Sequence, residues 1–377
     1  MFTRSASCEA TYCWVINSNV DSAAVDAVLD SLRKQQRACA KLGSTFYELV
    51  LETLAQDYVD GGITHKLLSG VSDRPVHDAL PLRLLGGLHA IALSGLDADL
   101  SGQFPSTGGA PTEDLTSVVL ASLGRHRAAL SQSVRENVQT NEVGRSLVAM
   151  SITRWLPNIG AATCRWFEVG ASAGLNLNFP RFHASTDRTE MGDPTSAISF
   201  GSEWFAKSPP HGASAECVEL RGCDPFPIDV TDVVQQRKLL GFVWPDQDAR
   251  LARLRRAIEI ATVHRPRLDR ADAGQWLASI DASPQRDGQA TVVYHSIVWQ
   301  YMSLESRRQF LHQLHLLAKT SSHDRPVVWA RMEPAGDTAD IRATVWTGKD
   351  IPRQYELGRV GYHGQDLRWS PREFSES

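Results

Sequence analysis

The chain has 377 residues, of which 42% are hydrophobic and 22% are charged, and its formal net charge is −4. Such a composition is typical of a soluble globular protein, and the length suffices for two domains of the usual ~100–200 residues. The charge gives no support for a nucleic-acid partner, which normally needs a basic face. No apolar run reaches the roughly 18–20 residues of a membrane span, and the N-terminus lacks the pattern of a signal peptide. We therefore expect a cytoplasmic protein with no membrane partner.

The first part of the chain is predicted to be almost entirely helical. Apolar residues recur at three- and four-residue spacing in residues 26–43 and 44–62, and each segment ends in glycine. No strand pattern occurs before about residue 156. We therefore assign residues 1–20 to an N-terminal extension and residues 21–155 to an all-helical cap domain.

The remainder, residues 156–377, alternates between strand-like and helical stretches. The strand-like runs are rich in β-branched and aromatic residues: CRWFEVGAS, ECVELRGCD, ATVVYHSIV and PVVWARMEP. Strands alternating with helices predict a mostly parallel sheet covered on both faces, as in a Rossmann-like α/β fold. Two further strand-like runs within residues 340–363 predict an antiparallel hairpin that ends the sheet.

The stretch G-A-S-A-G in the first of these runs fits the G-x-S-x-G nucleophile elbow of α/β-hydrolases, with Ser172 as the attacking hydroxyl. In such hydrolases several strands precede the elbow, whereas here nearly everything before residue 160 is helical. Possible triad partners nevertheless occur in hydrolase order, Asp224 or Asp272 followed by His295 or His363. A serine hydrolase is therefore our third hypothesis.

The same stretch, taken as E-V-G-A-S-A-G, favours a glycine loop after the first strand of a nucleotide-type domain. Glu168 would end the strand, and Gly170 and Gly174 would allow a tight turn and a close approach to a ligand. Ser172 replaces the middle glycine of the usual pattern. The alternative to a cofactor site is a tight strand-to-helix turn with no ligand.

Two later segments resemble class I S-adenosylmethionine-dependent methyltransferases. RLDRADAGQWL resembles their third-strand segment, which implies that Asp272 and Ala273 contact the adenine; the alternative is an Asp that caps the next helix. TVVYHSIVWQYMSLESRRQFLHQL resembles their fourth strand and the following helix. This resemblance implies that His295 and Ser296 lie beside the methyl donor, where many relatives have an acid.

The second strand offers two acids for the ribose hydroxyls of the cofactor, Glu219 and Asp224. Glu219 follows Gly174 by 45 residues, whereas a Rossmann-type acid follows the glycines by about 20. We therefore interpret residues 180–215 as an insertion, and the choice between the two acids stays open.

Taken together, the segments VQTNEVGRS, EVGASAGLNLN, ELRGCDPFPIDVTD, FVWPDQDARLARLRRA, VVYHSIVWQY, RMEP and GYHG resemble a bacterial family of uncharacterised, domain-of-unknown-function proteins. The resemblance runs from about residue 30 to 370 and implies a methyltransferase-like core. Candidate substrate contacts are Gln139, Asn141, Arg145, Trp244 and Tyr301. The alternatives are a helix-cap and interdomain salt-bridge network around Arg145, and a packing role for Trp244.

The best hypothesis from the sequence is a methyltransferase that binds S-adenosylmethionine and transfers its methyl group to a small molecule. If a base is used, His295 is the first choice because imidazole titrates near neutrality. The second hypothesis is a non-catalytic scaffold of the same fold that binds a nucleoside or a protein partner. The six cysteines form no C-x-x-C pair and no zinc spacing, so we expect free thiols and no metal. A homodimer is compatible with these patterns.

Overall fold

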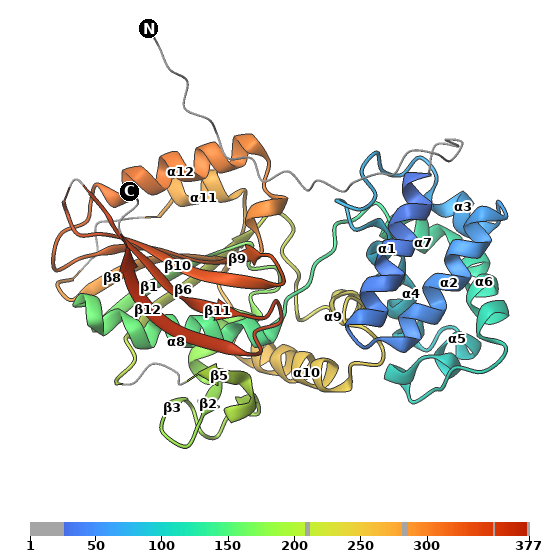
Figure 1. Cartoon of the computed structure of the whole chain (residues 1–377), viewed down its shortest axis with the longest axis horizontal. Helices are drawn as coiled ribbons and strands as arrows, with labels where there is room; N and C mark the ends of the chain where they lie inside the picture. The colour runs from blue at the N-terminus through green and yellow to red at the C-terminus, as the bar shows by residue number, and fades with distance from the viewer. Residues whose placement is uncertain (1–25, 208–211, 281–285, 350, 375–377) are drawn as a thin grey trace, which may run out of the picture.

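The computed structural model describes residues 26–207, 212–280, 286–349 and 351–374. Figure 1 shows two parts side by side, a bundle of helices and a layered part in which helices cover a twisted sheet. Within the described residues, every helix is too short or too polar to span a bilayer.

The helical part is formed by the N-terminal elements α1 (Ala27–Lys41), α2 (Thr45–Val59), α3 (Ile63–Leu68), α4 (Leu80–Ser94), α5 (Ala98–Gln103), η1 (Pro105–Thr107), α6 (Leu115–Arg125) and α7 (Arg127–Ser133). As the apolar spacing predicts, these helices bury a leucine-rich core of their own. The Ser44 hydroxyl caps α2 by accepting the Tyr47 N–H at 3.3 Å. Among the described residues, no strand precedes Thr163.

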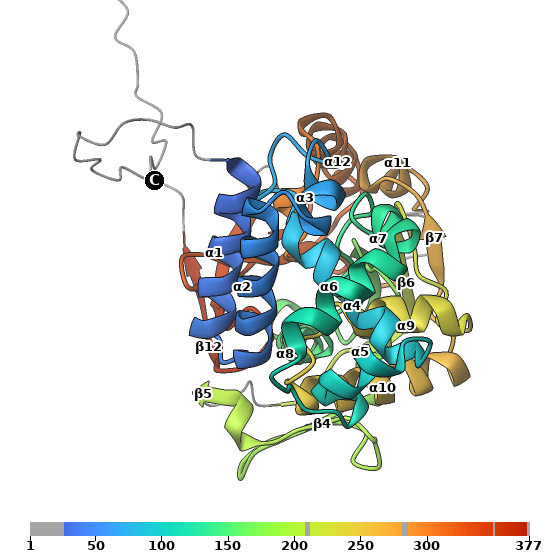
Figure 2. The ribbon, with the colours of Figure 1, turned by 90° about the vertical axis from the view of Figure 1, so that its right-hand side faces the viewer.

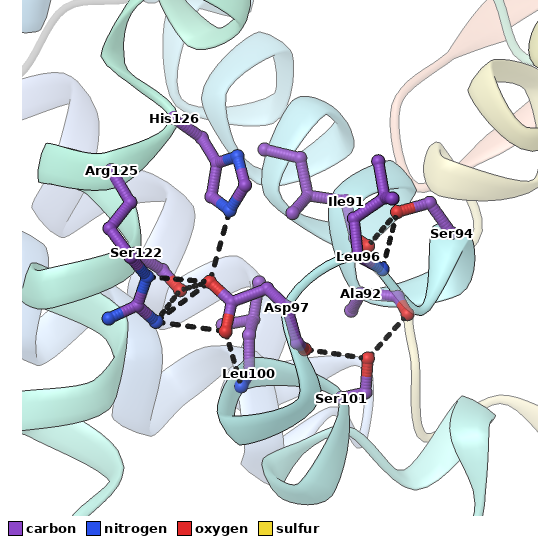
Figure 3. Close-up of polar contacts among 10 residues, drawn as sticks. All are labelled: Ile91, Ala92, Ser94, Leu96, Asp97, Leu100, Ser101, Ser122, Arg125 and His126. Atoms are coloured by element: carbon purple, nitrogen blue, oxygen red, sulfur yellow. Dashed lines mark hydrogen bonds and ion pairs between the residues drawn. The ribbon is translucent and has the colours of Figure 1, made fainter.

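A buried carboxylate ties together α5, α6 and α7 (Figure 3). Asp97, 5% exposed, caps α5 by accepting the Leu100 N–H at 3.2 Å. It also accepts hydrogen bonds from the Ser122 hydroxyl, from Arg125 at 2.8 Å and from His126 at 3.1 Å. Burial opposes ionisation, but the bonds from Ser122 and Arg125 outweigh it and lower the pKa of Asp97 to about 2.

The main sheet has a parallel half and an antiparallel half. The parallel strands lie in the order β7 (Leu268–Arg270), β6 (Glu216–Asp224), β1 (Thr163–Val169), β8 (Gln289–Ser296) and β9 (Val327–Ala335). The antiparallel strands continue it as β10 (Thr338–Trp346), β11 (Arg353–Val360) and β12 (Leu367–Phe374), and β5 (Phe205–Lys207) pairs with β12 at the far edge.

Helices cover both faces of the parallel half. Figure 1 shows α11 (Ala273–Ala278) and α12 (Leu304–Ala318) on one face, and α8 (Ser146–Trp155) and α10 (Asp248–Val263) on the other. Successive residues of β1 serve opposite faces, since Trp166 packs with the α8 and α10 residues and Phe167 with the α11 and α12 residues. The chain is thus a mixed α/β protein with a mostly parallel sheet, as predicted.

The remaining elements complete the description. They are the short helices η2 (Val143–Arg145), η3 (Leu156–Ile159), η4 (Leu175–Arg181), η5 (Ser202–Trp204), η6 (Trp299–Tyr301) and α9 (Val233–Gly241), and a small sheet of β2 (His183–Ser185), β3 (Glu190–Gly192) and β4 (Ser199–Phe200). The small sheet and β5 lie in residues 180–215, the predicted insertion.

Three expectations from the sequence need correction. The predicted hairpin forms as β10 and β11, but it does not end the sheet because β12 pairs with β11. Helix α8, placed with the helical part from the sequence, buries its apolar residues against the sheet. Conversely, α9 packs against α4 (Figure 2), and the side chain of Trp244 lies in the core of the helical part. The two parts therefore interlock instead of meeting at one boundary.

Candidate functional site

A cavity of about 530 Å³ lies where the carboxyl ends of the parallel strands meet the helical part. This volume falls in the roughly 300–1,000 Å³ range of small-molecule sites. From β1 the chain builds outward to β6 and β7 on one side and to β8 and β9 on the other. Ligands of open α/β sheets bind at such a reversal, in the crevice beyond the strand ends. Four adjacent strand ends contribute cavity residues: Glu168, Val169, Gly170 and Ser172; Cys223, Asp224, Pro225 and Phe226; Ala271, Asp272 and Ala273; Ser296, Ile297 and Val298.

The loop after β1 turns sharply at the cavity. Gly170 has φ +69°, and a Cβ there would lie 2.5 Å from a methyl carbon of Val298, so the position requires glycine. Ser172 has φ +54°. The Asp224 carboxylate holds the loop, accepting the N–H groups of Ser172 and Phe226, each at 2.9 Å. Burial raises the pKa of Asp224 above its ordinary value despite these two bonds.

Glu168, the last acid of β1, is buried without a partner. Its side chain lines the cavity and is 4% exposed, yet none of the described residues gives it a hydrogen bond or an ion pair. Burial raises its pKa to about 8, with Arg145 acting in the opposite direction. Because buried polar groups are normally paired, an orphaned carboxyl on a cavity wall indicates a group that serves a ligand.

Arg145 faces the same cavity and, within the described ranges, pairs only with neutral groups. Its Nε donates to the Tyr362 carbonyl at 3.0 Å, and its Nη1 donates to the Ser296 carbonyl at 3.4 Å. Burial lowers the pKa of the Arg145 guanidinium, and Glu142 opposes this shift. Glu142 itself pairs with Arg250, whose Nε lies 2.9 Å from it. Arg145 thus keeps its charge available to an anionic group.

Asp272 caps a helix, which is one of the two alternatives that the sequence left open. It caps α11 by accepting the Gly274 N–H at 2.9 Å, and its other oxygen accepts the Ser306 hydroxyl at 2.6 Å. It also lines the cavity, together with Ala273 and Ser306. The helix cap is therefore confirmed, and it fixes the carboxylate at the cavity wall.

The polar segment before α8 makes several hydrogen bonds to the sheet part. Gln139 donates to the Phe226 carbonyl at 2.8 Å and accepts the Ser172 hydroxyl at 3.3 Å. Asn141 accepts the Leu175 N–H at 3.0 Å. These contacts hold the segment against the glycine loop, and Gln139 and Asn141 line the cavity as well. Tyr301 lies at the same cavity with its side chain largely exposed.

His295 does not lie on the cavity wall, contrary to its predicted place. Strand alternation turns its side chain toward α12, where it is 1% exposed among aromatic rings. Its Nδ1 lies 2.6 Å from a carboxylate oxygen of Glu333, and its Nε2 accepts the indole N–H of Trp329 at 3.0 Å. Both ring nitrogens are occupied, so His295 is not positioned to take a proton from a molecule in the cavity.

Three other predicted residues also lie off the cavity. Glu219 sits within β6 and pairs with Arg165 at 2.7 Å, so Asp224 is the acid at the end of that strand. Gly174, with φ +68°, faces Pro266, whose Cβ would lie 2.8 Å from an added Cβ. Trp244 is 8% exposed in the helical core, which supports the packing alternative.

The helical part contributes a cavity wall that the sequence reasoning missed. It consists of Arg74, His77, Asp78, Ala79 and Arg83, around the start of α4. The available signal was Arg74, His77 and Asp78 shortly before the apolar helix α4 and Arg83 in its first turn, but no motif marks them. Ala79, Ser172 and Ile297 have positive φ values and all line the cavity. Backbone strain of this kind clusters at functional sites.

In the part of the chain that is described, no group of three or more His, Cys, Asp or Glu side chains could hold a metal ion. The described cysteines are free thiols, as predicted: Cys39, Cys164, Cys217 and Cys223. Cys8 and Cys13 lie outside the described residues.

Comparison with known proteins yields one match. Residues 30–369 fit a family described as "Uncharacterized protein conserved in bacteria (DUF2332)". No curated protein and no solved structure matches the chain.

Proposed function

Because the chain belongs to the bacterial DUF2332 family, whose description states no reaction, we propose a function from the cavity: the protein binds S-adenosylmethionine and transfers its methyl group to a small molecule. One observation carries the proposal. The glycine loop after β1 and the residues after β6, β7 and β8 line a single cavity at the reversal of strand order. The order of the parallel strands corresponds to 3-2-1-4-5, which supports a Rossmann-like, methyltransferase-like core.

The charges of the cavity fit the parts of this cofactor. Glu168 and Arg145, neither of them in an ion pair among the described residues, suit an ammonium and a carboxylate group. From the described residues, Asp224 accepts one hydrogen bond at each oxygen, which leaves lone pairs for ribose hydroxyls. Asp272 and Ala273 remain the candidates for the adenine, as the resemblance implies.

The bound cofactor would supply an electrophilic methyl group. The chain's own contribution is to exclude water and to hold the cofactor and the acceptor in a reactive orientation. Orientation of this kind can remove a large part of the activation barrier of a bimolecular reaction. With His295 occupied by Glu333 and Trp329, the proposed transfer relies on positioning.

The structure departs from the predicted terminal hairpin at the C-terminal end. Instead of one hairpin, β10, β11 and β12 follow β9 as a continuous antiparallel series. The departure is confined to the half of the sheet that does not carry the cavity.

Calorimetric titration with S-adenosylmethionine and S-adenosylhomocysteine tests the proposal. We expect micromolar binding that Asp272→Ala weakens at least about tenfold, since the variant loses a cavity carboxylate. Asp114→Ala is the control, because Asp114 is exposed and its side chain caps nothing. Failure of a folded wild-type protein to bind either compound would contradict the proposal.

A non-catalytic binding protein is the second candidate. It is favoured by the place of His295 outside the cavity and by Ser172 in the middle glycine position. A turnover screen with a labelled methyl donor separates the candidates. Sustained binding without transfer to any nucleophile favours the binding protein.

A serine hydrolase is the third candidate and has the least support. The Ser172 hydroxyl donates to Gln139, and neither His295 nor His363 lines the cavity. Labelling by a fluorophosphonate probe that disappears in Ser172→Ala would support it nonetheless.

A further inference from the structure

The cavity wall of the helical part carries two arginines that have no acid partner among the residues the structure describes. Arg83 donates from Nη2 to the Asn137 side chain at 3.1 Å and from Nη1 to the Val134 carbonyl at 3.4 Å, both neutral groups. Its Nε is buried and has no hydrogen-bond partner. Arg74 is exposed and makes no side-chain hydrogen bond or ion pair with any residue that the structure describes.

The single acid of this wall is already engaged. Asp78 accepts the Ser72 hydroxyl at 2.6 Å and lies 3.0 Å from Nδ1 of His77. These two bonds lower the pKa of Asp78, and Arg83 and Arg74 add to the effect at longer range. Two guanidinium groups against one carboxylate leave the wall with a net positive charge.

On the side of the strand ends, the cavity is lined by the carboxyl groups of Glu168, Asp224 and Asp272, together with Arg145. The proposed cofactor uses these groups, and its carboxylate is accounted for by Arg145. In this arrangement no group of the proposed cofactor would pair with Arg74 or Arg83.

We propose that Arg74 and Arg83 form an oxyanion subsite that binds a carboxylate or a phosphate of the methyl acceptor. The acceptor is thus a small anion that enters between the helical part and the strand ends. The forked N–H groups of arginine match the oxygens of both kinds of anion. That the anion belongs to an acceptor rests on the proposed function, whereas the oxyanion subsite itself rests on Arg74 and Arg83.

The test is calorimetric titration of the full-length protein with inorganic phosphate and, separately, with succinate, at constant ionic strength in chloride. We expect saturable binding of at least one of them, and the two arms decide between phosphate and carboxylate. Arg74→Gln/Arg83→Gln should weaken it at least about tenfold, because charge-assisted bonds are lost. Arg33→Gln/Arg37→Gln is the matched control, since both arginines are exposed on α1 away from the cavity.

Titration with S-adenosylhomocysteine separates this inference from the proposed function. The double variant should bind S-adenosylhomocysteine as the wild type does. If the wild type binds phosphate or succinate through Arg74 and Arg83 but does not bind S-adenosylhomocysteine, the subsite stands and the methyltransferase proposal fails. The subsite is refuted if neither anion binds saturably, or if the double variant binds the anion with the affinity of the wild type. Arg74→Gln alone repeats the test at an exposed position should the double variant not fold.

Discussion

Two buried carboxyl groups in the two parts of the molecule have opposite environments. Asp97 in the helical part is 5% exposed and is surrounded by donors from α5, α6 and the start of α7 (Figure 3). Glu168 at the end of β1 is 4% exposed and has no partner within the described ranges. The pKa of Asp97 falls to about 2, whereas the pKa of Glu168 rises to about 8. Burial alone therefore does not decide whether a carboxyl stabilises the fold.

The difference separates a structural group from a ligand-binding group. A buried carboxylate that accepts several hydrogen bonds contributes to stability, whereas a buried one without partners reduces it. A protein retains such a cost where the group has another use. On this comparison Asp97 connects helices, whereas Glu168 is the candidate for contact with a ligand in the cavity.

The largest expected effect is a gain in stability from Glu168→Gln at alkaline pH. Glu168 ionises near pH 4.5 when unfolded and near pH 8 when folded. Between these values the folded state binds more protons, so wild-type stability falls as the pH rises. At about 1.4 kcal/mol per pH unit, the variant should be more stable than wild type by about 4 kcal/mol at pH 8 and by only about 1 kcal/mol at pH 5.

Urea unfolding of both proteins at pH 5, 7 and 8 measures the difference in their unfolding free energies. The contributions of other titrating groups are the same in both proteins and cancel in this difference. Glu113→Gln, at an exposed position, is the control and should change stability by less than about 0.5 kcal/mol. A loss of stability in Glu168→Gln at pH 8 would show that the Glu168 carboxylate has a stabilising partner, contrary to the contrast drawn with Asp97.

Asp97→Asn should have the opposite sign at neutral pH. The lowered pKa of Asp97 corresponds to about 2 kcal/mol of stability, present above the unfolded pKa near 4. The deficit of the variant should narrow as the pH falls from about 4 to about 2, where Asp97 becomes protonated in the wild type. Asp99→Asn, exposed in the first turn of α5, should be nearly neutral in the same urea titration. Equal losses of stability in Asp97→Asn and Asp99→Asn would show that Asp97 does not have the structural role assigned to it.

Binding gives the third measurement. If Glu168 receives the ammonium group of the cofactor, Glu168→Gln should weaken S-adenosylhomocysteine at least about tenfold, or about 1.4 kcal/mol, while raising stability. Asp97→Asn should leave the affinity unchanged in calorimetry, because Asp97 does not line the cavity. Unchanged affinity in Glu168→Gln would end the assignment of Glu168 to the cofactor.

The sequence sufficed for those features that depend on local pattern. The strand-like runs fall on β1, β6, β8 and β9, and the position of the glycine loop after the first strand follows from the order of elements. Asp272 was recognisable as a cap because capping involves a neighbouring N–H. The antiparallel pairing of β12 was missed because this strand contains Pro371 and several charged residues, which are unusual in a strand. The small sheet near residue 190 was missed because β2, β3 and β4 are too short to carry a pattern.

The sequence did not predict which way the side chains at the strand end face, nor how segments far apart in the chain pack together. His295 and Ser296 are neighbours at one strand end, yet only Ser296 lines the cavity, because successive side chains of a strand face opposite ways. A shift of one residue in register would have exchanged them. Arg83 belongs to a helix far from the sheet in sequence, and its place at the site depends on how the two parts pack.

The smallest expected effect tests whether the cavity stores backbone strain as well as an unpaired charge. Ala79 precedes α4 with φ +50°, a conformation that costs a non-glycine residue about 1 kcal/mol. Glycine relieves this cost but loses more chain entropy on folding, so Ala79→Gly should gain about 0.5 kcal/mol in urea unfolding. Ala98→Gly, in the first turn of α5, should instead lose up to about 1 kcal/mol. If Ala79→Gly loses as much as Ala98→Gly, the positive φ carries no cost. Backbone strain would then not be a feature that distinguishes the cavity from the rest of the molecule.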